Sequence, residues 1–209
     1  MSDFPLADGT PGDDEDGPAL PSSQSLSLAN HFLIAMPSMA DERFPDTVIY
    51  VFEHSSERSM GVVINKPTDL TLEKLFERVD MKLEIAVLGE QPVCYGGPVA
   101  TDRGFVLHDQ RDADYGSTLT ADNGLSLTTS KDVLEAMADG RGPQKVMVAL
   151  GYAGWEAGQL ENEIARNAWL TVPADPAVVF DVPHAQRRAS AMQLLGFDPS
   201  ALSGEAGHA

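Results

Sequence analysis

Short runs of apolar residues, mostly β-branched or aromatic, recur along the first third of the chain. Residues 31–36 read His-Phe-Leu-Ile-Ala-Met and residues 47–52 read Thr-Val-Ile-Tyr-Val-Phe. Runs of this length and composition predict buried strands. A third run, 60–65, follows the second after the polar stretch 54–59, and this arrangement predicts an antiparallel hairpin. Pro67 is expected to end the third strand.

Apolar residues at helical spacing follow these strands. After Thr71 the intervals are three and four residues, which predicts a short amphipathic helix with Thr71 as its N-cap. A second such helix is predicted around Val133 and Met137, with Thr129 or Ser130 as its cap and Gly140 at its end. The apolar positions that define the first helix are Leu72, Leu75, Phe76 and Val79.

The second half of the chain alternates strand and helix patterns. Residues 145–150 form a strongly β run that predicts a central strand, and a helix is expected from about Glu156 to Ala168. A last helix is expected to begin at Pro183 and to end at Gly196. Further strands are predicted at 93–95, 105–108, 125–127 and 178–182. An early hairpin followed by this alternation favours an α+β fold with a mixed sheet over a doubly wound parallel sheet.

Length and charge divide the chain into a tail and one domain. The 209 residues are 43% hydrophobic, which suits one globular domain. Residues 1–25 hold six acidic residues, four prolines and no lysine or arginine. This composition predicts a disordered acidic tail, followed by a single domain at 26–209. The segment 1–25 also lacks the basic start and apolar stretch of a targeting signal.

Composition also excludes several function classes. The 32 acidic and 14 basic residues give a formal charge of −18, which disfavours direct nucleic-acid binding because phosphate contacts need a concentrated basic face. The single cysteine, Cys94, excludes an internal disulfide framework and sites that need several thiolates, so a reducing cytoplasm is expected. No run is apolar and long enough for a membrane span. The five histidines show no helical metal pair, so neither a metal nor a cofactor is expected.

Two polar stretches are candidates for chemistry. Asn65 and Lys66 end a predicted buried strand before a proline, which would hold both side chains at a rim. Residues 151–155 read Gly-Tyr-Ala-Gly-Trp and are expected to form a strand-to-helix turn. The glycine spacing there fails the dinucleotide-binding pattern. Two interpretations stay open: a binding cleft, or a turn anchored in the core by Trp155 with the neighbouring polar residues as caps.

Several segments, in this order, resemble the AlgH/YqgE family of bacterial proteins. The resemblance covers residues 28–209, and the acidic front extension and Lys66, where the family often has arginine, depart from it. The segments are Phe32-Leu33-Ile34-Ala35-Met36-Pro37, Gly61-Val62-Val63-Ile64-Asn65-Lys66-Pro67, Gly96-Gly97-Pro98-Val99, Gly151-Tyr152-Ala153-Gly154-Trp155 with Gln159-Leu160-Glu161 and Glu163, and Asn167-Ala168-Trp169-Leu170.

The resemblance implies a compact α+β fold with a coiled, partly barrel-like mixed sheet and several short helices. Members are often labelled transcriptional regulators, and the family has no established activity, substrate or cofactor. It implies a candidate surface for a ligand or partner, without assigning catalytic roles. The residues of that surface are Asn65, Lys66, Gly96, Gly97, Tyr152, Trp155, Gln159, Glu161, Glu163 and Asn167.

Two hypotheses from different classes follow. The first is a non-enzymatic cytoplasmic binding or regulatory protein with a protein or small-molecule partner. The alternative is an enzyme of unrecognised class that acts on a small molecule at this surface, with Glu161, Glu163 or Cys94 as acid, base or nucleophile. In that alternative, Asn65 and the turn at 151–155 would position the substrate.

Overall fold

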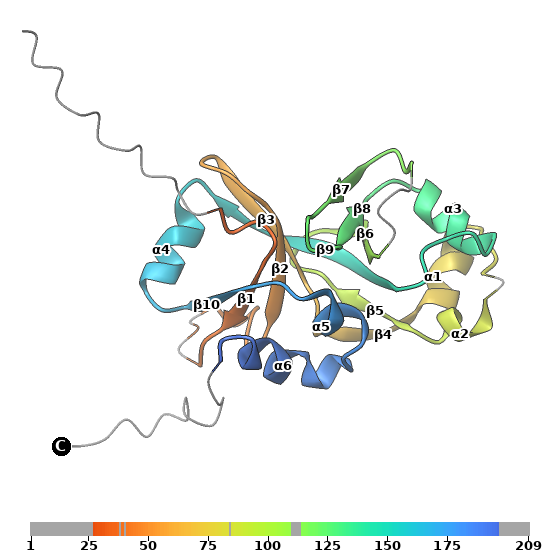
Figure 1. Ribbon diagram of the computed structural model, residues 1–209. Helices are drawn as coiled ribbons and strands as arrows, with labels where there is room; N and C mark the ends of the chain where they lie inside the picture. The colour runs from red at the N-terminus through yellow and green to blue at the C-terminus, as the bar shows by residue number, and fades with distance from the viewer. Residues whose placement is uncertain (1–26, 38, 40, 84, 110–113, 197–209) are drawn as a thin grey trace, which may run out of the picture.

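The computed structural model (Figure 1) describes residues 27–37, 39, 41–83, 85–109 and 114–196. Within these ranges ten strands form one curled sheet in the order β10-β1-β2-β3-β9-β6-β8-β7, with β5 paired to β9 and β4 paired to β5. The strands are β1 (His31–Ala35), β2 (Val48–His54), β3 (Arg58–Val63), β4 (Pro67–Thr71), β5 (Pro92–Tyr95), β6 (Val99–His108), β7 (Thr118–Thr120), β8 (Ser126–Thr128), β9 (Val146–Glu156) and β10 (Trp169–Pro173).

Short helices cover the sheet and close its ends (Figure 1). They are α1 (Leu72–Arg78), α2 (Ala86–Gly89), α3 (Asp132–Ala138), α4 (Gln159–Ala165), α5 (Pro176–Phe180), the 3-10 helix η1 (His184–Gln186) and α6 (Arg187–Gln193). Buried residues of α5 and α6 pack into the largest apolar cluster, together with strand residues such as Phe32 and Phe105. Leu160 of α4 packs with Trp155 and Trp169 in a second cluster. The third cluster lies under α1 and α3.

Strand β9 joins the two halves of the sheet. Its second half pairs with β3, from Arg58↔Glu156 to Gly61↔Ala153, and its first half pairs with β6, from Gly104↔Leu150 to His108↔Val146. β5 runs parallel to β9, with Cys94 opposite Ala149. All the other pairings within the described residues are antiparallel. The predicted α+β fold class, with a mixed and partly barrel-like sheet, is therefore confirmed.

The backbones of the 96–97 segment and of β9 come very close at the middle of that strand. The Gly96 N–H donates to the Leu150 carbonyl at 2.8 Å. A Cβ added at Gly96 would lie 2.1 Å from the Gly151 carbonyl oxygen, and one added at Gly97 would lie 2.1 Å from the Tyr152 carbonyl carbon. No side chain fits between these backbones, so glycine is required there.

The early elements agree with the sequence predictions. The β2–β3 hairpin is antiparallel, and the Thr71 Oγ1 accepts from the Lys74 N–H at 3.4 Å as the N-cap of α1. At α3 the cap prediction is wrong, because Lys131 occupies the N-cap position and the Ser130 hydroxyl donates to Asp132 instead. Gly140 follows the end of that helix, as predicted.

Four predictions in the chain are corrected by the structure. Residues 178–182 do not form a strand, because Asp175 caps a helix that begins at Pro176 and its Oδ1 accepts from the Ala177 N–H at 2.8 Å. Pro67 begins β4 instead of ending a strand. Residues 151–155 are not a strand-to-helix turn, because β9 continues through them to Glu156. The helix expected at 156–168 is confined to Gln159–Ala165.

The predicted acidic tail at 1–25 lies outside the described residues. Within the part of the chain that the structure covers, no helix has the length and apolar character needed to cross a membrane.

Candidate functional site

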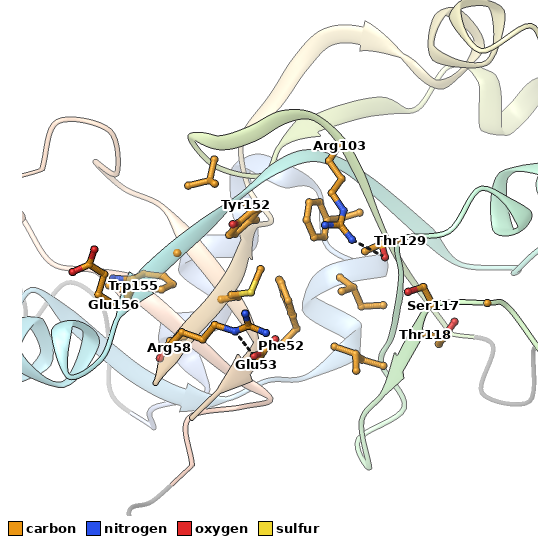
Figure 2. A pocket seen from close by; sticks show the side chains of 18 residues that line it. Phe52, Glu53, Arg58, Arg103, Ser117, Thr118, Thr129, Tyr152, Trp155 and Glu156 are labelled. Atoms are coloured by element: carbon orange, nitrogen blue, oxygen red, sulfur yellow. Dashed lines mark hydrogen bonds and ion pairs between the residues drawn. The ribbon is translucent and has the colours of Figure 1, made fainter. Parts of the chain in front are cut away.

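A cleft of about 720 Å³ lies between the β2–β3 and β7–β8 hairpins (Figure 2). Three aromatic side chains from different strands line it: Phe52 of β2, Phe105 of β6 and Tyr152 of β9. The Phe52 and Phe105 ring centroids are 5.9 Å apart, and those of Phe105 and Tyr152 are 5.6 Å apart. These rings form a continuous apolar floor. The rim also includes two exposed apolar side chains, Val99 and Leu119.

Two arginines extend over this cleft from separate strands (Figure 2). Arg58 of β3 is paired through its Nε with the Glu53 Oε1 at 2.6 Å, and this bond raises the pKa of Arg58. Arg103 of β6 donates from Nη2 to the Thr129 Oγ1 at 3.3 Å, and its Cζ lies 5.5 Å from the Phe105 ring centroid. The guanidinium of Arg103 therefore has a neutral hydrogen-bond partner, whereas that of Arg58 has a carboxylate.

A second cavity of about 280 Å³ adjoins the cleft. The two share Val99, Gly154 and Trp155 as lining residues. Aromatic rings also wall the second cavity. The Trp155 and Trp169 ring centroids are 6.1 Å apart with the rings almost perpendicular, and Phe44 meets Trp169 edge-on at 5.9 Å.

The Glu163 carboxylate organises the wall of this second cavity. Its Oε2 accepts from the indole N–H groups of Trp155 at 2.9 Å and Trp169 at 2.8 Å. Its Oε1 accepts from the Gln159 Nε2 at 2.9 Å, and the Gln159 Oε1 in turn accepts from the Glu156 N–H at 3.1 Å. Three donors thus occupy the carboxylate and fix both indole rings.

The structure brings together only part of the surface predicted from sequence. Tyr152, Trp155, Gln159 and Glu163 line one or both cavities. The six other predicted residues line neither cavity: Asn65, Lys66, Gly96, Gly97, Glu161 and Asn167. The glycines lie at the backbone crossing, and the Lys66 carbonyl accepts from the Tyr95 N–H at 2.8 Å.

Asn65 and Asn167 have local structural roles. The Asn65 Oδ1 accepts from the Val48 N–H, and its Nδ2 donates to the Asp46 carbonyl, both at 2.8 Å, so this side chain fixes the start of β2. Asn167 follows α4 with φ 56°, and its N–H donates to the Ile164 carbonyl at 2.9 Å. Asparagine tolerates this left-handed conformation better than most residues.

Cys94 is fully buried in the largest apolar cluster. Burial raises the pKa of its thiol to about 11, although the nearby Arg187 guanidinium acts in the opposite direction. The neutral thiol therefore predominates at neutral pH, and a neutral buried thiol is a poor nucleophile.

Glu161 belongs to an arrangement that the sequence did not reveal. The His54 Nδ1 is 2.8 Å from the Ser59 hydroxyl, and the His54 Nε2 is 3.5 Å from the Glu161 Oε1. A serine, a histidine and a carboxylate in this order resemble the chain of groups that activates a nucleophilic serine. However, Ser59 is only 2% exposed. The three residues therefore tie α4 to the β2–β3 hairpin.

We expect a fluorophosphonate reagent to leave Ser59 unmodified, because this residue is only 2% exposed even though it lies in the wall of the cleft. Intact-mass and peptide mass spectrometry of the full chain after incubation would measure this, with an active serine hydrolase as the positive control. Stoichiometric labelling of Ser59 that disappears in His54→Ala would contradict the structural role and support the enzyme hypothesis.

Most residues that line the cleft were not predicted as site residues from the sequence. Phe52 and Phe105 fell in predicted strands and looked like ordinary core positions. Arg103 lies in the first half of β6. The sequence 100–104 lacks a run of apolar residues, so only the second half of this strand, 105–108, was predicted. The available signal was an aromatic residue at the end of one predicted strand, Phe52, and another at the start of a later predicted strand, Phe105. Without the strand order, nothing in the sequence shows that these two residues meet.

No group of three or more His, Cys, Asp or Glu side chains in the described ranges is arranged to hold a metal ion.

Comparisons with known proteins match the chain to one protein family. A family model described as AlgH-like matches residues 32–200. A UPF0301 protein of Ralstonia pickettii strain 12J is 58% identical over 184 residues, covering 88% of this chain and 96% of that protein. A UPF0301 protein of Paraburkholderia phytofirmans is 56% identical over 189 residues, covering 90% and 98%.

Two solved structures are also similar. The solution structure of the AlgH protein from Pseudomonas aeruginosa matches with a TM-score of 0.73 and 49% identity, over 91% of this chain and 100% of that chain. A crystal structure of a Corynebacterium diphtheriae protein matches with a TM-score of 0.65 over 86% of this chain and 91% of that chain. At 22% identity, the second likeness concerns the fold alone.

Proposed function

The chain belongs to the AlgH-like family, and from that premise we propose that it is a non-enzymatic binding protein whose cleft holds a small anionic ligand with a flat apolar body. The observation that carries the proposal is the pair of arginines, Arg58 and Arg103, above the aromatic floor. A guanidinium recognises carboxylate and phosphate oxygens by paired hydrogen bonds, and aromatic faces bind planar rings. The cleft volume of about 720 Å³ is in the range of small-molecule sites.

Arg103 is the expected anchor for the anion. Thr129 is a neutral partner, so a ligand oxygen can replace it without separating an ion pair. Arg58 is already paired through Nε with the Glu53 carboxylate, whose negative charge offsets its own and makes its contribution smaller. The net charge of −18 repels anions at long range, but screening limits that effect to about 8–10 Å at physiological salt. Close contacts therefore decide the affinity.

The environments of the candidate catalytic groups favour binding over turnover. Cys94 is buried as a neutral thiol, and Glu163 is occupied by three donors. We further propose that the bound ligand has a regulatory role in the reducing cytoplasm, which suits a chain with one buried cysteine. The acidic charge argues against direct contact with nucleic acid.

We expect the full chain to bind 8-anilinonaphthalene-1-sulfonate more tightly than its uncharged counterpart N-phenyl-1-naphthylamine. Arg103→Ala should weaken binding of the sulfonate about tenfold, which is the loss of one charge-assisted hydrogen bond, and should leave the uncharged compound unaffected. Fluorescence titration at pH 7 and constant salt measures both affinities.

The matched control is Arg141→Ala, because Arg141 is an exposed arginine paired with Asp139 and lines neither cavity. Equal affinity for the two compounds would contradict anion recognition at this cleft. An Arg103→Ala variant that binds the sulfonate as wild type does would also contradict it.

A further inference from the structure

Arg187, at the start of α6, is a buried cation. Its side chain is only 4% exposed, and burial lowers its pKa. It donates from Nε to the Val182 carbonyl at 3.0 Å and from Nη1 to the Ile64 carbonyl and to the Met147 sulfur. Among the described residues, no carboxylate forms an ion pair with it. Burial of a charge without a counter-ion is costly, so this guanidinium attracts an anion.

His184 lies one turn before Arg187 and has a buried ring nitrogen without a partner. Its Nε2 is inaccessible to solvent and makes no hydrogen bond in the described structure. Burial and the neighbouring Arg187 lower the pKa of His184 to about 4, so the ring is neutral at pH 7. A neutral imidazole still carries one N–H, which can donate to an anion.

Both side chains line the same cavity, of about 260 Å³, between the start of β9 and the α5–α6 segment. The other ionisable side chain that lines it, Asp181, has both oxygens held by the Lys145 Nζ, at 2.6 and 2.7 Å. Its charge is therefore compensated, which leaves Arg187 as the unbalanced charge at this cavity. A water molecule takes about 30 Å³ in the liquid, so the space admits a ligand of several heavy atoms.

We propose that this cavity binds a small oxyanion, a phosphate or a carboxylate, with Arg187 as the counter-charge and His184 as a hydrogen-bond donor. The site shares no residue with the cleft between the hairpins. It is therefore independent of the proposed function, and either can fail without the other.

The experiment uses the full chain at pH 7 in a buffer without oxyanions. Thermal unfolding is followed with sodium phosphate, sodium acetate or sodium chloride at equal ionic strength, and isothermal titration measures the affinity for phosphate. We expect phosphate or acetate at ten times its dissociation constant to raise the thermal midpoint by about 3 °C beyond chloride. Phosphate alone would indicate a phosphoryl ligand, and acetate alone a carboxylate ligand.

Two variants locate the site. His184→Phe removes the donor and should weaken anion binding about tenfold, and Arg187→Met keeps the length of the side chain without its charge and should abolish binding. If Arg187→Met does not fold, His184→Phe decides the question. Arg141→Ala is the matched control, because Arg141 lines neither this cavity nor the cleft, and it should bind the anion as wild type does.

Equal midpoints in phosphate, acetate and chloride would overturn the proposal. So would a His184→Phe variant with wild-type affinity, because the anion would then bind elsewhere on the molecule.

Discussion

Gly96→Ala should lower the free energy of unfolding by at least about 4 kcal/mol, an effect large enough to prevent folding of a typical domain. The added Cβ would lie 2.1 Å from the Gly151 carbonyl oxygen and 3.1 Å from the Ala149 Cβ. Neither group can move away cheaply, because both belong to β9 and the Gly96 N–H bonds to the Leu150 carbonyl. Relief of the overlap would separate β5 from β9.

Soluble yield, circular dichroism and denaturant unfolding measure this effect. The matched control is Gly104→Ala on β6, where no heavy atom lies within 4 Å of an added Cβ. Replacement of a strand glycine by alanine should there be neutral or slightly stabilising. A Gly96→Ala protein as stable as Gly104→Ala would show that the close backbone approach is incorrect.

Glu163→Ala is expected to lower the free energy of unfolding by about 3 kcal/mol and the thermal midpoint by about 6–12 °C. The change leaves the indole N–H groups of Trp155 and Trp169 without their acceptor. These residues are only 5% and 3% exposed, so water cannot easily replace the carboxylate. Each unsatisfied buried donor costs about 1–3 kcal/mol.

Two further variants test whether Glu163 stabilises the protein as the acceptor for the two indole N–H groups. Glu163→Gln keeps an oxygen for the two indoles and should recover more than half of the loss. Glu161→Ala, on the exposed side of the same helix, should cost less than about 1 kcal/mol, because its contact with His54 is long and solvent-screened. Equal losses in Glu163→Ala and Glu161→Ala would contradict the network. A structural role also predicts that Glu163→Gln binds the naphthalene sulfonate normally.

The sequence predicted the elements whose signals are local. The β2–β3 hairpin and the capped helix α1 were correct because their patterns and caps do not depend on the rest of the fold. Residues 178–182 looked like a strand because of their valines, but the Asp175 cap and Pro176 outweighed β propensity over so short a run. The prediction that 151–155 form a turn failed because glycines there allow a close backbone approach within a continuing strand.

The candidate site depended on strand order, which the sequence could not supply. Trp155, Gln159 and Glu163 are close in sequence, so their association was predictable from a helix and its preceding strand. Phe52, Arg58 and Arg103 come from three strands that meet only because β9 lies between β3 and β6. Asn65 lies outside the cleft, where its side chain bonds to the backbone at the start of β2.

The position of β9 in the sheet also constrains how the protein is synthesised. During synthesis β3 is complete at Val63, but its partner β9 begins only at Val146. The partner of β1, strand β10, begins only at Trp169. At about 5–20 residues per second, translation leaves the first hairpin with unsatisfied edges for several seconds. The nascent chain thus exposes its most apolar strands to the cell before the strand that covers them exists.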